Sequence, residues 1–387
     1  MELNTEPFIF KLAKAELDIN NIEYDVIQST TINQPLLSLG YHYFMNRTRN
    51  DMINYTKNIK SDTKFYFVIN PFELDIANYE DNVIKLSDIY LNSKKPQSIS
   101  RSFYKTWELL YLFELTDKKD MVMTCIDKKE THIGLAFSSY KDKLDPSKYH
   151  INELNEDFRK NTLKTKSDLI IANCKLNIKS EVQIYQEQYM YELIFSEIVT
   201  SLKLQENKGH FVLRVFDTLT FLTIKLIYIV SAFYEETYLY KPYFSRPTSS
   251  EKYIIFKKFK GVPDKVIKSF EKMQSEITDK YIFDMMTNVI LPQDYIKNFT
   301  FININLVNPQ QIMMNKMITF IKENNYYGDK YHKYRELQIQ ATKWWVKMFY
   351  APSKNIYEQN KKELLGLLNT TNKTHELKEQ QFTQSLA

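Results

Sequence analysis

Glycine is scarce in this chain of 387 residues. There are six glycines, and each lies far along the chain from the next. A loop that wraps a phosphate or a nucleoside needs clustered glycines, because the backbone must approach the ligand with no Cβ in the way. The sequence therefore excludes a P-loop and a GxGxxG fingerprint.

Cysteine, histidine and long apolar runs are also rare. The two cysteines, Cys125 and Cys174, form no CxxC pair, and there are six histidines. This composition argues against a structural zinc site or a disulfide framework. The most apolar run, 221–233, contains Lys225 and is too short to span a bilayer, and the N-terminus lacks the apolar core of a signal peptide. We expect a cytoplasmic protein with no metal and no membrane contact.

What the chain does contain is enough apolar material for a large core. Hydrophobic residues make up 43% and aromatic residues 14% of the sequence. The net charge is +5 and the pI is about 8.7. This mild basicity is compatible with a polyanionic partner, but it is weaker than the clustered basic charge of a dedicated nucleic-acid binder.

Strand-like and helix-like segments alternate in the middle of the chain. Short apolar runs predict strands at 121–126, 132–137, 167–174, 209–217, 237–242 and 250–261. Amphipathic or apolar patterns predict helices at 98–115, 182–205 and 220–233. Strands that alternate with helices indicate an α/β fold with a mainly parallel sheet.

The flanking segments divide the chain into four expected regions. An N-terminal α/β region at 1–95 contains a strand-like run at 64–73 and a helix or strand at 79–91, and a polar linker follows at 92–98. The central domain covers 98–262. A helical region covers 263–352, with helices expected at 272–291 and 334–351, and a flexible tail covers 353–387.

Segment 208–261 contains the sequence motifs that say most about function. It reads strand, helix, strand, polar turn and strand, with the motifs GHFVLRVF and KPYFSRPTSSEKYI, and a helix at 100–109 reads SRSFYKTWEL. These motifs and their order resemble the FtsJ/RrmJ-type RNA ribose 2'-O-methyltransferases, especially the large cap-modifying and viral forms. The resemblance implies a Rossmann-like methyltransferase sheet over 98–262, with an N-terminal extension and a C-terminal helical region.

The resemblance also implies four catalytic positions, which the family fills with Lys, Asp, Lys and Glu. They deprotonate a ribose hydroxyl and aim it at the methyl group of S-adenosylmethionine. Lys105 in SRSFYK and Glu251 in the polar turn match the family. Asn173 in DLIIAN takes the place of the Asp, and Arg214 in FVLRVF takes the place of the second Lys.

The two replacements change the chemistry of the site. Asn173 cannot supply a negative charge to a nearby ammonium group, and Arg214 stays protonated, so it cannot act as a base. A charged side chain in an apolar strand needs a partner. We expect Glu251 to be that partner of Arg214, in a structural or ligand-binding ion pair.

The cofactor side departs further from the family. The resemblance implies that S-adenosylmethionine lies just after 121–126, where Asp127 is the candidate contact. Only 127–131 separate this run from the apolar run at 132–137, which leaves no length for a turn and a helix. Together with the missing glycines, this predicts a degenerate site without a bound cofactor.

The resemblance implies RNA, in particular the 5' end of mRNA, as the partner. Lys241, Arg246 and Lys252 in the polar turn are candidate phosphate contacts or part of an ordinary polar turn. Three functions stay open. The chain is a degenerate RNA-binding or scaffolding subunit beside an active methyltransferase or capping subunit, an active 2'-O-methyltransferase with a divergent cofactor loop, or an unrelated binding protein. A viral protein of this kind would act in the host cytoplasm or the virion.

Overall fold

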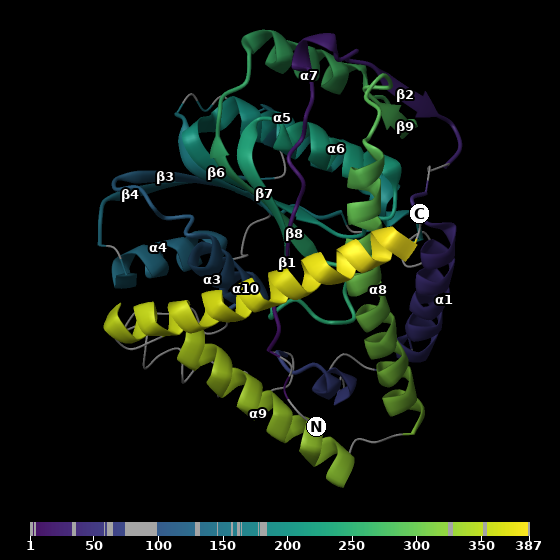
Figure 1. Ribbon diagram of the computed structural model, residues 1–387, viewed down its shortest axis with the longest axis vertical. Coiled ribbons are helices and arrows are strands. Elements are labelled where there is room, and N and C mark those ends of the chain that lie inside the picture. Colours follow the sequence, from purple (N-terminus) through teal and green to yellow (C-terminus); the bar gives the residue numbers. More distant parts are fainter. Residues whose placement is uncertain are drawn as a thin grey trace.

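A computed structural model describes residues 3, 5–32, 36–57, 59, 65–73, 99–127, 132–144, 146–155, 158–160, 163, 165–176, 178, 184–323, 328–350 and 354–385. A large mixed sheet lies at its centre. Its strands are β1 (Phe8–Lys11), β3 (Met121–Ile126), β4 (Tyr149–Leu154), β5 (Ser167–Ala172), β6 (Gln205–Val215), β7 (Tyr234–Lys241) and β8 (Lys252–Phe259). They lie in the order β1-β7-β8-β6-β5-β3-β4 (Figure 1).

The direction of the strands decides where a site can form. Strands β4, β3, β5 and β6 are parallel to one another, so their carboxyl ends meet at one edge of the sheet. Strand β8 runs antiparallel to β6, with Val215 opposite Lys252, so β8 begins at the edge where β6 ends. The chain therefore has the α/β, Rossmann-like sheet that the sequence predicted.

Helices cover both faces of this sheet (Figure 1). Helices α3 (Arg101–Phe113) and α4 (Ile133–Leu144) lie on one face, and α5 (Gln186–Leu204), α6 (Phe221–Ser231) and α7 (Asp264–Glu276) lie on the other. Each face has its own hydrophobic core. Because parallel strands are buried on both sides, they read as continuous apolar runs in the sequence.

Helix α4 corrects a prediction. The run at 132–137 was expected to be a strand, but it forms the start of α4. The buried residues Ile133, Ala136, Phe137 and Tyr140 recur at the three- and four-residue spacing of a helix face. Strand β4 follows and pairs in parallel with β3. The strand-helix-strand unit is complete, so the argument that the chain lacks the length for it was wrong.

Two other predicted elements also differ. The strand expected within 64–73 is a short 3-10 helix, η3 (Phe65–Ile69). The helix expected over 272–291 is not continuous. Helix α7 ends at Glu276, and β9 (Tyr281–Met285) then pairs antiparallel with β2 (Val26–Ser29) in a small second sheet. The elements expected at 79–91 and 92–98 lie outside the described residues.

Long helices complete the described part of the chain. They are α1 (Leu39–Thr56), α8 (Gln293–Lys322), α9 (Asp329–Phe349) and α10 (Lys354–Ser385), with the short 3-10 helices η1 (Ile19–Asn21) and η4 (Phe158–Lys160) elsewhere. Helix α9 confirms the helix predicted at 334–351. Helix α10 occupies the residues for which the sequence predicted a flexible tail, and in Figure 1 it crosses in front of α8. The four domain boundaries remain predictions.

Helix α9 and the residue that follows it share a core with α3. The ring of Tyr350 meets Trp107 at 4.5 Å between centroids, and Trp345 meets Tyr104 at 5.4 Å. The buried carboxylate of Glu108 accepts hydrogen bonds from Trp345 Nε1 and from the Tyr240 hydroxyl, at 2.9 and 2.6 Å. One acidic side chain therefore joins α3, β7 and α9.

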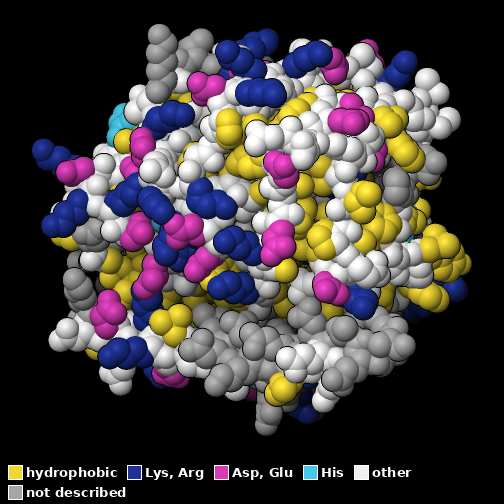
Figure 2. Space-filling view, turned by 45° about the horizontal axis from the view of Figure 1, so that its top comes forward, with side chains coloured by type: hydrophobic (Ala, Val, Ile, Leu, Met, Phe, Trp, Pro, Cys, Tyr) yellow, Lys and Arg dark blue, Asp and Glu magenta, His cyan; other side chains and the backbone are white. Residues whose placement is uncertain are grey.

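The surface is mixed in character. Figure 2 shows Lys, Arg, Asp and Glu side chains intermingled on one half of the visible face, and hydrophobic side chains gathered on the other half. Helix α1 exposes the large apolar side chains Leu39, Tyr43 and Phe44. Among the described residues, every helix is too short or too polar to cross a membrane.

Candidate functional site

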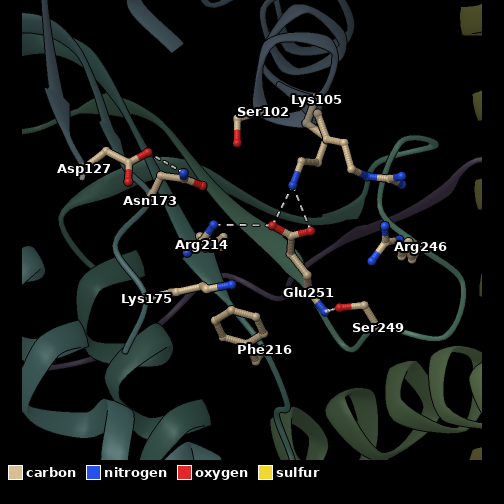
Figure 3. Close-up of a pocket in the computed structure, with 11 residues that line it drawn as sticks. Ser102, Lys105, Asp127, Asn173, Lys175, Arg214, Phe216, Arg246, Ser249 and Glu251 are labelled. Carbon is tan, nitrogen blue, oxygen red and sulfur yellow. Dashed lines mark hydrogen bonds and ion pairs between the residues drawn. The ribbon is translucent and has the colours of Figure 1, made fainter. Parts of the chain in front are cut away.

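A pocket lies at the edge where the parallel strands end (Figure 3). Its volume is about 390 Å³. Ligands of open α/β sheets bind in the crevice outside the carboxyl ends of the strands. The pocket is lined by Arg101, Ser102, Lys105, Asp127, Asn173, Lys175, Arg214, Phe216, Arg246, Ser249 and Glu251.

The four catalytic positions implied by the resemblance meet in this pocket, around Glu251. Lys105 Nζ donates to both carboxylate oxygens of Glu251, at 2.7 and 2.9 Å. Arg214 Nη1 lies 3.5 Å from Glu251 Oε1, which is the ion pair that the sequence predicted. Ser245 Oγ donates to the other oxygen at 2.8 Å. Lys105, rather than Arg214, is the closer cationic partner.

Burial and charge set the protonation of this cluster. Burial opposes ionisation of Glu251, but Lys105 and Arg214 outweigh it and hold the pKa of Glu251 well below its ordinary value. Burial also opposes protonation of Arg214, but Glu251 keeps the pKa of the guanidinium raised. The pKa of Lys105 is lowered, chiefly by burial, with Glu251 acting in the opposite direction.

Asn173 links the ends of two neighbouring strands. Its Nδ2 donates to Asp127 Oδ2 at 2.5 Å, and its Oδ1 accepts a hydrogen bond from the Tyr253 hydroxyl at 3.1 Å. Asp127 follows β3 and Asn173 follows β5. The carboxylate of Asp127 therefore lies one strand away from Asn173, the position at which the family has its Asp. The Asn173 amide is held in place by Asp127 on one side and Tyr253 on the other.

The three predicted RNA contacts separate into two groups. Arg246 lines the pocket and pairs with the buried Glu73 at 2.8 Å. Lys241 Nζ instead donates to the Ser249 carbonyl at 2.5 Å, and Lys252 Nζ donates to the Phe216 carbonyl.

Burial lowers the pKa of Lys241 to about 7 and that of Lys252 to about 8. Both side-chain amines are buried and donate to main-chain carbonyls of the protein itself. As RNA contacts, all three side chains remain predictions.

Sequence reasoning missed several pocket residues. Arg101 and Ser102 lie in the SRSFYK motif itself, and Ser249 lies in the polar turn. Lys175 and Phe216 follow closely after strands β5 and β6, so their position after a buried strand was a usable signal. Among the described residues, five cationic side chains but only the two carboxylates of Asp127 and Glu251 line the pocket.

A further acidic residue lies at the end of β4. The first turn of α4 packs so closely on β4 that a Cβ on Gly134 would lie 3.1 Å from Glu153 Oε1. In dinucleotide-binding folds, an acidic side chain after the second strand of such a unit holds a ribose hydroxyl. Glu153 is therefore the described residue best placed to hold the ribose of a nucleoside cofactor. Residues 128–131 of the adjoining loop lie outside the described part.

The chain has relatives among known proteins. The model of the FtsJ-like methyltransferase family matches residues 147–259. An uncharacterized protein of Acanthamoeba polyphaga mimivirus is 28% identical over 279 residues, which cover 70% of this chain and 71% of that protein.

Two further relatives are named for cap methylation. A cap-specific mRNA (nucleoside-2'-O-)-methyltransferase 1 of Trypanosoma cruzi is 30% identical over 110 residues, 28% of this chain and 30% of that protein. An inactive cap-specific mRNA (nucleoside-2'-O-)-methyltransferase 1B of Caenorhabditis briggsae is 21% identical over 369 residues, 87% of this chain and 42% of that protein. The matches span less than half the length of these two relatives.

Proposed function

We propose that this chain, a member of the FtsJ-like methyltransferase family, binds RNA near the 5' end of mRNA and does not itself transfer a methyl group. The observation that carries the proposal is the buried Arg214 beside Glu251, at the position where the family has a lysine base. A guanidinium with a raised pKa cannot accept the proton of a ribose hydroxyl.

The charge of the pocket supports RNA as the ligand. Within its described lining, five cationic side chains outnumber two carboxylates. Glu73, which is not part of the lining, neutralises part of the charge of Arg101 and Arg246. The pocket remains positive and suits a phosphate backbone, whose contacts dominate the affinity of proteins for nucleic acids.

Active methyl transfer is the second candidate, because the strand-helix-strand unit β3-α4-β4 is complete. S-adenosylmethionine would supply the methyl group, and Glu153 and Asp127 would hold it. Lys105, whose pKa is lowered by burial, is the pocket residue closest to acting as a neutral amine. In this case Lys105 would take the proton of the hydroxyl.

The name of one relative is in line with a chain that does not transfer methyl groups. The Caenorhabditis briggsae protein is called inactive. We propose that this chain serves as an RNA-binding or scaffolding subunit in the cytoplasm, next to an active methyltransferase or capping subunit.

The test compares RNA binding with methyl transfer. Fluorescence anisotropy with a capped RNA at several salt concentrations measures binding, and radiolabelled S-adenosylmethionine measures transfer to the same RNA. We expect affinity that falls with salt and no labelled product. Labelled product would establish the second candidate, and an absence of salt-dependent affinity would favour an unrelated binding protein.

A charge variant makes the binding test specific to the pocket. Lys175→Gln removes an exposed cation of the lining, so it should weaken binding and reduce the salt slope by about one unit. Lys272→Gln removes an exposed cation from α7 and is the matched control. Equal effects of the two variants would show that the RNA does not enter the pocket.

A further inference from the structure

A second pocket adjoins the first. Its volume is about 310 Å³, and it shares Lys175, Phe216 and Ser249 with the pocket at the strand ends. The two pockets therefore form one groove, which continues from the sheet edge toward α1 and α8. The remaining residues of the second pocket are Arg49, Met52, Leu176, Ile178, Gln186, Thr248, Ser250 and Gln310.

The chemistry of the second pocket differs from that of the first. Its arginine, Arg49, is held by both carboxylate oxygens of Asp217, each at 2.7 Å, so its charge is balanced. Apart from the shared Lys175, the other walls are apolar side chains, amides and hydroxyls. Gln186 has no hydrogen-bond partner among the described residues. Beyond the shared Lys175, a wall that combines apolar side chains, hydroxyls and an available amide fits a nucleobase better than a phosphate.

Phe216 stands at the junction of the two pockets. The guanidinium carbon of Arg214 lies 5.3 Å from the centre of its ring, on the side of the first pocket. In Figure 3 the Lys175 side chain lies between Arg214 and Phe216, and no described residue pairs with its ammonium group. An aromatic ring next to an unpaired cation is the arrangement that holds a stacked base and the phosphate attached to it.

We propose that this groove binds two consecutive nucleotides of single-stranded RNA. The first pocket takes one ribose, Lys175 binds the phosphate between the nucleotides, and the next base stacks on Phe216 beside Gln186. A single strand is favoured, because taking a base out of a duplex costs free energy for unpairing and unstacking. This inference rests on the proposed RNA binding and adds the length and form of the ligand.

The experiment uses 5'-phosphorylated oligouridylates of one, two and four nucleotides, with binding to the full chain measured by calorimetry. The dinucleotide should bind much more tightly than the mononucleotide. Phe216→Ala should remove this gain, weakening dinucleotide binding roughly 5- to 150-fold, while Phe216→Tyr should keep it. Phe44→Ala, which removes an exposed ring of α1 outside both pockets, is the matched control.

A second variant guards against misfolding. Phe216 is half-buried, so Phe216→Ala is accepted only if its thermal unfolding matches that of Phe216→Tyr. If it does not, Gln186→Ala, at the rim of the second pocket, must weaken dinucleotide binding without affecting the mononucleotide.

The outcomes separate the two proposals. If no oligouridylate binds at any length, the proposed RNA binding fails. If the tetranucleotide binds but no groove variant changes its affinity, or if a duplex binds equally well, only the two-nucleotide groove is overturned.

Discussion

At the scale of single residues, Glu251 organises the candidate site. It is the carboxylate shared by Lys105 and Arg214, and it also accepts a hydrogen bond from Ser245. Two buried cations depend on it, so the loss of this one charge would leave both of them uncompensated. The site is therefore also a point on which the stability of the fold depends.

Glu251→Gln should lower the free energy of unfolding at pH 7 by about 3–5 kcal/mol, because it removes one partner of a buried ion pair. The folded-state pKa of Glu251 lies below its ordinary value of 4.5, so its contribution is present above that pH and is lost as the pH falls further. The difference between the variant and the original chain should therefore shrink in acid. Urea unfolding across the pH range measures it.

Glu192→Gln serves as the control for this prediction. Glu192 forms an exposed pair with Arg159 on the surface of α5, and such pairs are worth about 0–1 kcal/mol. A loss of stability in Glu251→Gln no greater than that in Glu192→Gln would show that the buried cluster is not coupled as the distances indicate.

Glu197 gives the opposite dependence on pH. It is fully buried in α5, and burial raises its pKa to about 8. One of its carboxylate oxygens has no hydrogen-bond partner among the described residues. The folded-state pKa of Glu197 is raised above its ordinary value of 4.5. The neutral side chain therefore contributes fully to the stability of the fold below pH 4.5, and this contribution is lost as the pH rises through about 8.

Glu197→Gln, which stays neutral, should therefore be more stable than the original chain at pH 9, by roughly 1–3 kcal/mol. At pH 4.5 the two should be nearly equal. Thermal unfolding at both values measures the effect. An identical pH profile for the two proteins would mean that Glu197 is not buried as a neutral acid.

At the scale of elements, α4 completes the strand-helix-strand unit β3-α4-β4, the kind of unit that binds a nucleoside cofactor in α/β folds. The run at 132–137 is short and apolar, and such a run fits a buried strand and a buried helix equally well. Beyond its end, Tyr140 and Leu144 continue the helical spacing of Ile133, Ala136 and Phe137. The close approach of Gly134 to β4 then fixes the helix against its neighbour.

Gly134→Ala should stabilise the chain by about 0.5–1 kcal/mol, because alanine is the better helix former and the exposed Glu153 side chain can move aside. Gly366→Ala in α10, where a new Cβ meets nothing within 4 Å, is the matched control. Denaturant unfolding compares the two. A loss of stability only in Gly134→Ala would show that α4 and β4 leave no room for the added methyl group.

Much of the sheet, and the meeting of the four positions implied by the resemblance in one pocket, could be predicted from the sequence. The buried strands form continuous apolar runs, and Glu251 lies in a turn with the distinctive motif KPYFSRPTSSEKYI. The pairing of Lys105 with Glu251 was missed, because a lysine on a helix gives no local sign of burial. Strand β9 was missed because its residues fit a helical pattern, and only pairing with the distant β2 makes it a strand.

At the scale of the whole molecule, the C-terminal helices are part of the core. Trp345 of α9 and the neighbouring Tyr350 pack on Tyr104 and Trp107 of α3, the helix that also carries Lys105. Glu108, whose pKa burial raises to about 7, connects these helices through Trp345. The position of Lys105 in the pocket therefore depends on residues more than two hundred positions away in the chain.

Deleting 329–387 should abolish cooperative unfolding, because it exposes the apolar rings that α9 covers. Deleting only 377–387 should have little effect, since Leu377 is already exposed. Circular dichroism during heating distinguishes the two. A cooperative transition in the shorter chain that lacks 329–387 would show that the sheet folds without its helical cover.

The position of β1 at the edge of the sheet has a consequence for folding during translation. Phe8 pairs with Lys241, so β1 lacks its partner strand β7 until residue 241 has been made. At about 5–20 residues per second, this wait lasts roughly 10–50 s. During translation the nascent chain carries an unpaired apolar strand, which a chaperone could hold until β7 has been made.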